Sequence, residues 1–410
     1  MGRRVERLEW IVWAAYLLIG PVTWAVVAVL VGQGRKKMRL GKSSHRKSEG
    51  SPRATIVIPA KDEGERIRDC IVSALRQEYS NFSVLAVDDR STDRTGAVMD
   101  ELAVKFAGKL KVVHIPAGGL RAGWTGKCNA LYTAVGGLDR IGEGDEWLLF
   151  IDSDVVLEPR ALAATVGLGA GRKYDMVSLL IRAESHSFWE GLLVPLAGIG
   201  LTTLYLVALT NDDETPTAFA NGQYLMIRRS VYDAIGGHEA VKDRYCEDID
   251  MARVVKGKGY KVRIFWGPEL AAVRMYSSLE SIFKGWARIF FSASVGRPWR
   301  ILLGMSFVAV CGLSAYAALV WGLVRVRTAA GAIWLAAAGV HLAIMTAFLA
   351  AVYAWSGNRR RNALWFPIGA GMLLGIFAKA LRMCATGKVE WRGTRYGSRR
   401  KEECRMQNAE

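Results

Sequence analysis

The sequence predicts an α/β domain with a mainly parallel sheet covered by helices on both faces, together with transmembrane helices. Short apolar runs alternate with segments of helical periodicity between about residues 54 and 294. Four acidic clusters follow these runs or glycine-marked loops, and long uncharged segments flank the region. Alternating strands and helices favour a parallel sheet, and uncharged runs of about 20 residues favour membrane spans.

The β-branched run at residues 54–59 ends at a proline, and apolar side chains then recur at helical spacing. The next apolar run ends at Asp88-Asp89, where Ser91 or Thr92 can cap a helix. Ligands of such sheets bind beyond the carboxyl ends of the strands, so the acidic clusters are expected to share one site. Strands are predicted at 54–59, 82–87, 111–115 and 147–151, and helices at 65–77 and 127–135.

Three uncharged segments are long enough to cross a bilayer, and residues 363–378 form a shorter fourth that either crosses or lies in the interface. Residues 191–210 are also uncharged, but a crossing there would place Asp154 and Asp248 on opposite sides of the membrane. The predicted division is a transmembrane anchor (1–34), a basic linker (35–53), the α/β domain (54–294, with buried or interfacial helices at 188–210 and 280–294), carboxyl-terminal transmembrane helices (295–383, at about 301–324, 328–356 and 363–383) and a basic tail (384–410).

The net charge of +17 comes from 55 basic and 38 acidic residues, and the excess lies beside the apolar segments. Juxtamembrane basic clusters are typical of cytoplasmic loops and disfavour nucleic-acid binding. Placing the clusters at 35–47 and 359–361 inside makes the α/β domain cytoplasmic in a multi-pass protein of the cell membrane. Four spans would then put the basic tail outside, and the sequence leaves the side of the tail and the oligomeric state open.

Asp152-Ser153-Asp154 directly follows the apolar run 147–151. Two carboxylates at a strand end can hold one hard cation, and Mg²⁺ or Mn²⁺ bound in this way also binds a diphosphate. The alternative is a turn whose aspartates cap the next helix.

Two further groups of polar residues lie where they could contact a bound nucleotide. Asp88-Asp89 ends a buried strand, where a carboxylate can accept hydrogen bonds from the imide N–H and hydroxyls of a nucleoside. Lys127 enters a helix from a glycine-marked loop and can contact phosphate.

Glu247-Asp248 precedes a predicted helix. A carboxylate there is often a helix cap, but it can also act as a general base if it meets an acceptor hydroxyl. Asp248 is predicted to take the proton, with Glu247 orienting it.

Taken together, residues 57–63, 87–95, 152–154 and 247–248 resemble the family 2 inverting nucleotide-sugar glycosyltransferases of GT-A fold. The membrane layout is similar to members acting on hopanoid or carotenoid lipids and, more remotely, to ceramide glucosyltransferases. The resemblance implies a UDP-sugar donor, or less often a GDP-sugar, a membrane lipid acceptor, and Mn²⁺ or Mg²⁺. It implies a nucleotide-sugar site at Pro59, Ala60, Glu63, Asp88, Asp89, Lys127, Asp152 and Ser153, a metal at Asp154 with Asp152, and Asp248 and Glu247 as catalytic groups.

One departure bears on the acceptor. Processive and ceramide-type relatives carry Gln-x-x-Arg-Trp after the base, where this chain has Gly285-Trp286-Ala287-Arg288-Ile289. Arg288 can still neutralise the leaving diphosphate. The acceptor-stacking tryptophan is either missing or displaced to Trp286, and a non-processive enzyme is predicted. Asn221-Gly222-Gln223 resembles the acceptor-side loop of the family or is a simple turn. A polyprenyl-phosphate sugar synthase and a non-catalytic nucleotide-sugar sensor remain alternatives.

Overall fold

The computed structural model describes residues 2–41, 52–138, 146–204, 206–244, 246–294, 297–386, 388–391 and 394–397. Most of the predicted basic linker (42–51) and much of the predicted basic tail lie outside these described residues. The chain forms two compact units. The sheet unit comprises residues 34–184 and 205–275, and the helical unit comprises residues 1–33, 185–204 and 276–410.

A seven-stranded sheet organises the sheet unit, in the order β3-β2-β1-β4-β8-β6-β9. Only β8 runs antiparallel to its neighbours β4 and β6, and the other pairings are parallel. This order confirms the predicted mainly parallel sheet. The strands are β1 Arg53–Ala60, β2 Phe82–Asp89, β3 Leu110–Ile115, β4 Glu146–Phe150, β6 Met176–Leu180, β8 Leu225–Arg228 and β9 Val262–Trp266.

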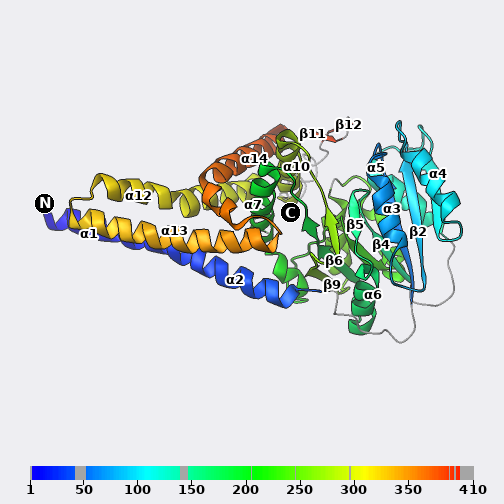
Figure 1. Ribbon diagram of the computed structural model, residues 1–410, viewed down its shortest axis with the longest axis horizontal. Coiled ribbons are helices and arrows are strands. Elements are labelled where there is room, and N and C mark those ends of the chain that lie inside the picture. The colour runs from blue at the N-terminus through cyan, green and yellow to red at the C-terminus, as the bar shows by residue number, and fades with distance from the viewer. Residues whose placement is uncertain are drawn as a thin grey trace, which may run out of the picture. The chain divides into compact units, whose positions relative to one another are not determined.

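Apolar residues cover both faces of the sheet because successive side chains of a strand point to opposite sides. Ile56 and Ile58 of β1 belong to one buried core, whereas Val57 belongs to the other. The first core packs against α3 (Ile67–Leu75), α4 (Thr95–Lys105) and α6 (Ala161–Arg172), and the second against α5 (Gly126–Gly136) and α9 (Glu247–Gly257). Figure 1 shows these helices alongside the strands.

A small second sheet continues from the end of β4. Its strands β5 (Val155–Leu157), β10 (Ala271–Val273) and β7 (Arg182–Ala183) lie in the order β5-β10-β7. Because β5 begins at Val155, the residues 152–154 span the short connection between the two sheets. The backbone of residues 152–154 is therefore held by β4 on its amino-terminal side and by β5 on its carboxyl-terminal side.

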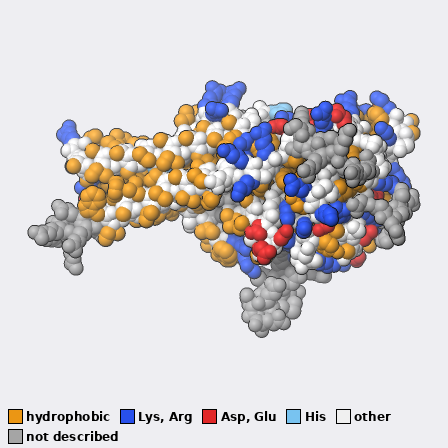
Figure 2. All heavy atoms as spheres, turned by 90° about the horizontal axis from the view of Figure 1, so that it is seen from below, with side chains coloured by type: hydrophobic (Ala, Val, Ile, Leu, Met, Phe, Trp, Pro, Cys, Tyr) orange, Lys and Arg blue, Asp and Glu red, His pale blue; other side chains and the backbone are white. Residues whose placement is uncertain are grey.

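Among the described residues, four helical segments are long and apolar enough to cross a membrane: residues 9–38, 298–324, 329–355 and 360–386. Figure 2 shows hydrophobic side chains gathered over the helical unit, and they include strongly exposed residues such as Trp10, Leu30 and Val324. Exposed apolar surface of this extent is typical of lipid-facing helices. The unit contains α1 Gly2–Leu17, most of α2 Thr23–Met38, α7 Phe188–Leu204, α10 Leu279–Ala293, α11 Pro298–Ser306, α12 Ser314–Val324, α13 Ala329–Trp355 and α14 Phe366–Thr386.

Two glycines of α6 provide a matched test of packing in the sheet unit. A Cβ on Gly169 would lie 2.8 Å from Cη2 of Trp147 and 3.2 Å from Cε of Met226, whereas a Cβ on Gly171 would meet nothing within 4 Å. Gly169→Ala should therefore destabilise the fold by about 1–3 kcal/mol through overpacking, and Gly171→Ala should stabilise it by up to about 1 kcal/mol through helix propensity. Thermal unfolding of the full-length variants in detergent measures both, and equal midpoints would contradict this packing.

Candidate functional site

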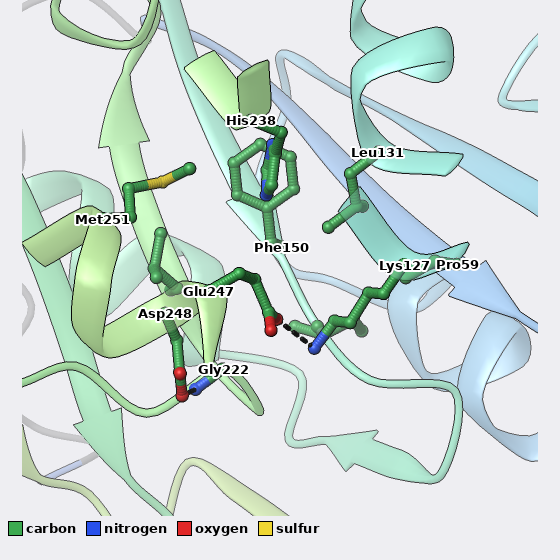
Figure 3. A pocket seen from close by; sticks show the side chains of 11 residues that line it. Pro59, Lys127, Leu131, Phe150, Gly222, His238, Glu247, Asp248 and Met251 are labelled. Atoms are coloured by element: carbon green, nitrogen blue, oxygen red, sulfur yellow. Dashed lines mark hydrogen bonds and ion pairs between the residues drawn. The ribbon is translucent and has the colours of Figure 1, made fainter. Parts of the chain in front are cut away.

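The carboxyl ends of β1, β2 and β4 lie at one edge of the sheet, as parallel pairing requires. In the register of β1 with β2, Ala60 is opposite Asp88, and Pro59 and Ala60 are buried. A pocket opens at this edge (Figure 3). Its lining combines charged groups with an apolar wall and consists of Pro59, Lys127, Leu131, Phe150, Ile151, Gly222, Leu225, His238, Glu247, Asp248 and Met251.

Lys127 joins the two acidic sides of the site. Its ammonium nitrogen Nζ lies 2.6 Å from Oδ1 of Asp152 and 2.7 Å from Oε1 of Glu247, and Figure 3 shows Lys127 and Glu247 pointing toward each other. Burial alone would lower the pKa of Lys127, but the two carboxylates outweigh it and raise that pKa well above its usual value. Lys127 therefore stays protonated and ties α5 to the end of β4 and to the start of α9.

Asp248 lies in the first turn of α9, and each of its two carboxylate oxygens accepts a hydrogen bond from a backbone N–H group. The N–H of Gly222 donates to Oδ2 at 2.7 Å, and the N–H of Ile249 donates to Oδ1 at 2.8 Å. Burial, followed by the charge of Glu247, raises the pKa of Asp248 to about 7, although Lys127 and the two N–H donors oppose the shift. A carboxylate with this pKa can accept a proton near neutral pH.

Asp154 provides a second perturbed carboxyl group, in the connection that follows β4. Burial, and then the charges of Asp152 and Glu63, raise the pKa of Asp154 to about 7. Within the described ranges, no group of three or more His, Cys, Asp or Glu side chains is assembled for a metal ion. Asp152 and Asp154 nevertheless fit a divalent cation whose remaining ligands come from a diphosphate, because a cation would relieve the repulsion between these carboxylates. Ser153 between them is buried.

The two aspartates at the end of β2 have different partners. Asp88 accepts from the backbone N–H of Ser91 at 3.0 Å, and its other oxygen lies 3.1 Å from Nδ1 of His114. Asp89 is 5% exposed and is held by both Nε and Nη2 of Arg90, at 2.7 and 3.0 Å. The helix that follows, α4, has Arg94 as its N-cap, with no side-chain cap hydrogen bond. The predicted capping by Ser91 or Thr92 is therefore wrong, because the helix begins only at Thr95.

Glu63 lies in the loop after β1, which is tied to the loop after β2. The backbone N–H of Glu63 donates to Oγ1 of Thr95 at 2.8 Å, and the N–H of Gly64 donates to Oδ2 of Asp93 at 2.9 Å. These bonds hold together the two loops for which nucleoside binding is predicted.

Asn221-Gly222-Gln223 forms a turn before β8. The side-chain amide of Asn221 donates to the carbonyl of Leu179 at 2.8 Å and to Oε1 of Gln223 at 3.3 Å. The turn thus places the N–H of Gly222 on Asp248, a link that the sequence pattern did not predict. An acceptor role for these three residues stays a prediction.

Trp286 and Arg288 belong to the helical unit, where both lie on α10. Trp286 is 5% exposed, and its ring centroid lies 5.7 Å from that of Phe290. The predicted roles of Trp286 in acceptor binding and of Arg288 at the leaving diphosphate remain predictions.

His238 is a pocket residue that the sequence analysis did not single out. Its Nδ1 lies 2.8 Å from the hydroxyl of Tyr232, and its ring meets that of Phe150 edge-on at 4.9 Å. Burial, with a contribution from Lys127, lowers the pKa of His238 to about 3. The imidazole is therefore neutral and packs as part of the apolar wall. The Gly236-Gly237 pair before His238 is a turn signal in the sequence, and in the structure these glycines have positive φ angles of 85° and 57°.

A family model described as Glycosyl transferase family 21 matches residues 21–404. The chain belongs to this family. This assignment confirms the resemblance carried by the four motifs, which pointed to the glycosyltransferases of GT-A type that include carotenoid-lipid enzymes. The family 21 model covers the pocket residues, the second part of the first apolar helical segment and all of the other three.

This family 21 chain is similar to 4,4'-diaponeurosporenoate glycosyltransferase of Staphylococcus aureus. It is 25% identical to the proteins of strains MRSA252 and USA300 over 254 residues, which are 60% of this chain and 63% of those relatives. The match thus spans less than two thirds of the length of these curated relatives.

Two solved structures are also similar to this family 21 chain. The mannosyltransferase PcManGT from Pyrobaculum calidifontis, in complex with GDP-Man and Mn²⁺, superposes with a TM-score of 0.48 at 18% identity, covering 81% of this chain and 97% of that one. Glucosyl-3-phosphoglycerate synthase from Mycobacterium tuberculosis, in complex with Mn²⁺ and UDP-glucose, superposes with a TM-score of 0.38 at 18% identity, covering 61% and 84%. At these levels of identity and superposition, the two likenesses assign neither a donor nor a metal to this chain.

Proposed function

We propose that the protein is a membrane-bound, non-processive inverting glycosyltransferase that moves a sugar from a UDP-sugar to a lipid hydroxyl. The family assignment supports sugar transfer. The observation that carries the mechanism is the Lys127 bridge, because it links the diphosphate-side carboxylate Asp152 to Glu247, the neighbour of Asp248. Donor and base would therefore occupy one pocket.

The donor would bind along the carboxyl edge of the sheet. Its nucleoside would meet Glu63 and Asp89 in the tied loops after β1 and β2, and its diphosphate would meet Lys127. Pro59, Ala60, Asp88, Asp152 and Ser153 would complete this nucleotide-sugar site. Lys127 would offset negative charge that grows on the diphosphate as it leaves.

Asp248 would act as the general base. It would take the proton of the acceptor hydroxyl while the acceptor oxygen forms a bond to the anomeric carbon. The bond from that carbon to the diphosphate oxygen breaks in the same step, and UDP departs with the electron pair. One in-line displacement inverts the anomeric configuration. The N–H groups of Gly222 and Ile249 would hold the carboxylate in place throughout.

A divalent cation, Mn²⁺ or Mg²⁺, would be held by Asp154 and Asp152 together with donor phosphate oxygens. When bound, it would supply charge neutralisation for the leaving diphosphate. The clustering of Asp152, Asp154 and Glu63 supports this assignment, since burial and like charges raise the pKa of Asp154.

The acceptor would be a membrane lipid. Four segments able to span a bilayer support this proposal, as does the similarity to proteins named for glycosylating a carotenoid acid. Asn221, Gly222 and Gln223 would lie on the acceptor side of Asp248. For Trp286 and Arg288 of the helical unit, the proposed roles in acceptor binding and in neutralising the leaving diphosphate rest on the sequence resemblance alone. The basic cluster after the first span supports a cytoplasmic sheet unit.

Asp248→Asn tests the base directly. The amide keeps the size of the carboxylate but cannot take a proton, so transfer should fall at least about a hundredfold. UDP binding should stay within about twofold, because no nucleotide contact is removed. Transfer assays and calorimetry in detergent measure the two quantities, and transfer by Asp248→Asn at the wild-type rate would exclude Asp248 as the base.

The pH dependence of transfer follows from the raised pKa of Asp248. The base works only when ionised, so kcat/KM should fall about tenfold per pH unit below about pH 7 and level off above it. His238 cannot cause this limb, because its lowered pKa of about 3 keeps it neutral throughout. In Asp248→Glu the midpoint of the limb should move. A profile that is flat down to pH 5 would contradict the assignment.

A further inference from the structure

Arg90 and Asp89 are sequence neighbours that form a two-point ion pair. Side chains of adjacent residues in a strand point to opposite faces, so a two-point contact between them requires the backbone to turn. Arg90 makes that turn with a φ of 59°, in the left-handed region that a non-glycine residue seldom adopts. Strain of this kind persists where the surrounding structure holds it, and it concentrates at functional sites.

The resulting pair is well ordered and shielded from water. Nε and Nη2 of Arg90 lie 2.7 and 3.0 Å from the two oxygens of Asp89, and the side chains are 16% and 7% exposed. A planar fork on a carboxylate fixes its position and the direction of its lone pairs. Each carboxylate oxygen can still accept a further hydrogen bond.

Gly126 provides the space for this pair. A Cβ at that position would lie 2.6 Å from Oδ2 of Asp89 and 2.9 Å from Nη2 of Arg90. The next residue is Lys127, which reaches Asp152 and Glu247. The ion pair is thus seated against the start of α5, one residue from the lysine that serves the diphosphate in the proposed function.

Asp88 does not duplicate this arrangement. One of its oxygens accepts from the N–H of Ser91 and the other lies against Nδ1 of His114, and none of the described arginines holds it in a fork. Of the two aspartates that end β2, Asp89 is the one whose carboxylate is clamped in a single orientation.

We propose that Arg90 is a positioning residue for nucleobase recognition, which fixes Asp89 to accept the imide N–H of uracil, with Gly126 leaving room for the pair. The inference rests on the proposed function and deepens it. Uracil carries a donor N–H at N3, whereas cytosine has an acceptor there. A clamped carboxylate should therefore favour UDP over CDP, because cytosine would leave two acceptors facing each other.

The experiment measures Kd for UDP and CDP by calorimetry on the full-length protein in detergent. In Arg90→Lys, which keeps the charge but loses the fork, Kd for UDP should rise about tenfold, and the preference for UDP over CDP should shrink by a similar factor. The maximal transfer rate kcat should stay within about threefold, since the base and diphosphate groups are untouched. Arg68→Lys is the matched control, because Arg68 pairs with Glu101 on exposed helix surface, and both affinities should be unchanged in that variant.

Arg90→Gly separates positioning from folding. Glycine adopts a positive φ without steric strain, so the fold should be retained at the assay temperature. The thermal midpoint should fall because the ion pair with Asp89 is lost, and the UDP preference should be lost in the protein that remains folded. Gly126→Ala should weaken UDP binding in the same direction by displacing the pair. Wild-type affinity and preference in Arg90→Gly would overturn the inference, as would a loss in UDP and CDP affinity by equal factors. The wild-type protein is measured before the variants. If it binds neither UDP nor CDP, the proposed function itself is contradicted, and this result is distinct from a failure of the Arg90 inference.

Discussion

The ammonium group of Lys127, held between Asp152 and Glu247, is the interaction on which the arrangement of the site depends. It joins the end of β4, the start of α5 and the start of α9, which approach one another only at the carboxyl edge of the sheet. Without a cation between them, partly buried carboxylates at this edge would repel one another, and leaving such charges unpaired is costly. The bridge lets an acidic site persist beside an apolar wall formed by residues such as Phe150 and Met251.

The same bridge divides the acidic groups by environment. Asp152 and Glu247 form ion pairs with Lys127. Asp154 and Asp248 follow these two residues closely in the sequence, and burial together with neighbouring carboxylates raises the pKa of both Asp154 and Asp248 to about 7. Paired and unpaired carboxylates therefore alternate through the site. This alternation gives Asp248 the proton affinity of a base at neutral pH, while Asp154 is left as a carboxylate that a cation would stabilise.

The parts of the fold that local patterns determine could be predicted from the sequence. The strands that became β1, β2 and β4 are apolar runs that end at polar residues, and parallel pairing then brings Asp88, Asp89 and Asp152 to one edge. Features that depend on distant contacts could not be predicted. The antiparallel β8 lies between β4 and β6 because of tertiary pairing, and no periodicity reveals that its preceding turn places the N–H of Gly222 on Asp248. The packing of His238 on Phe150 likewise follows from a contact that is remote in sequence, and no residue pattern reveals the left-handed backbone of Arg90. For the same reason, the roles of Trp286 and Arg288 rest on sequence resemblance alone.

The most direct test of sugar transfer to a lipid is release of the nucleotide by the full-length protein. The protein is incubated in membrane lipid extract with a panel of UDP-sugars, with Mn²⁺ or with EDTA, and free UDP is measured. The account predicts UDP release from one or more of these donors that requires both lipid and the divalent cation. Tight UDP binding with no turnover of any donor, including GDP-sugars tested in parallel, would contradict it and favour a protein that only senses the nucleotide-sugar.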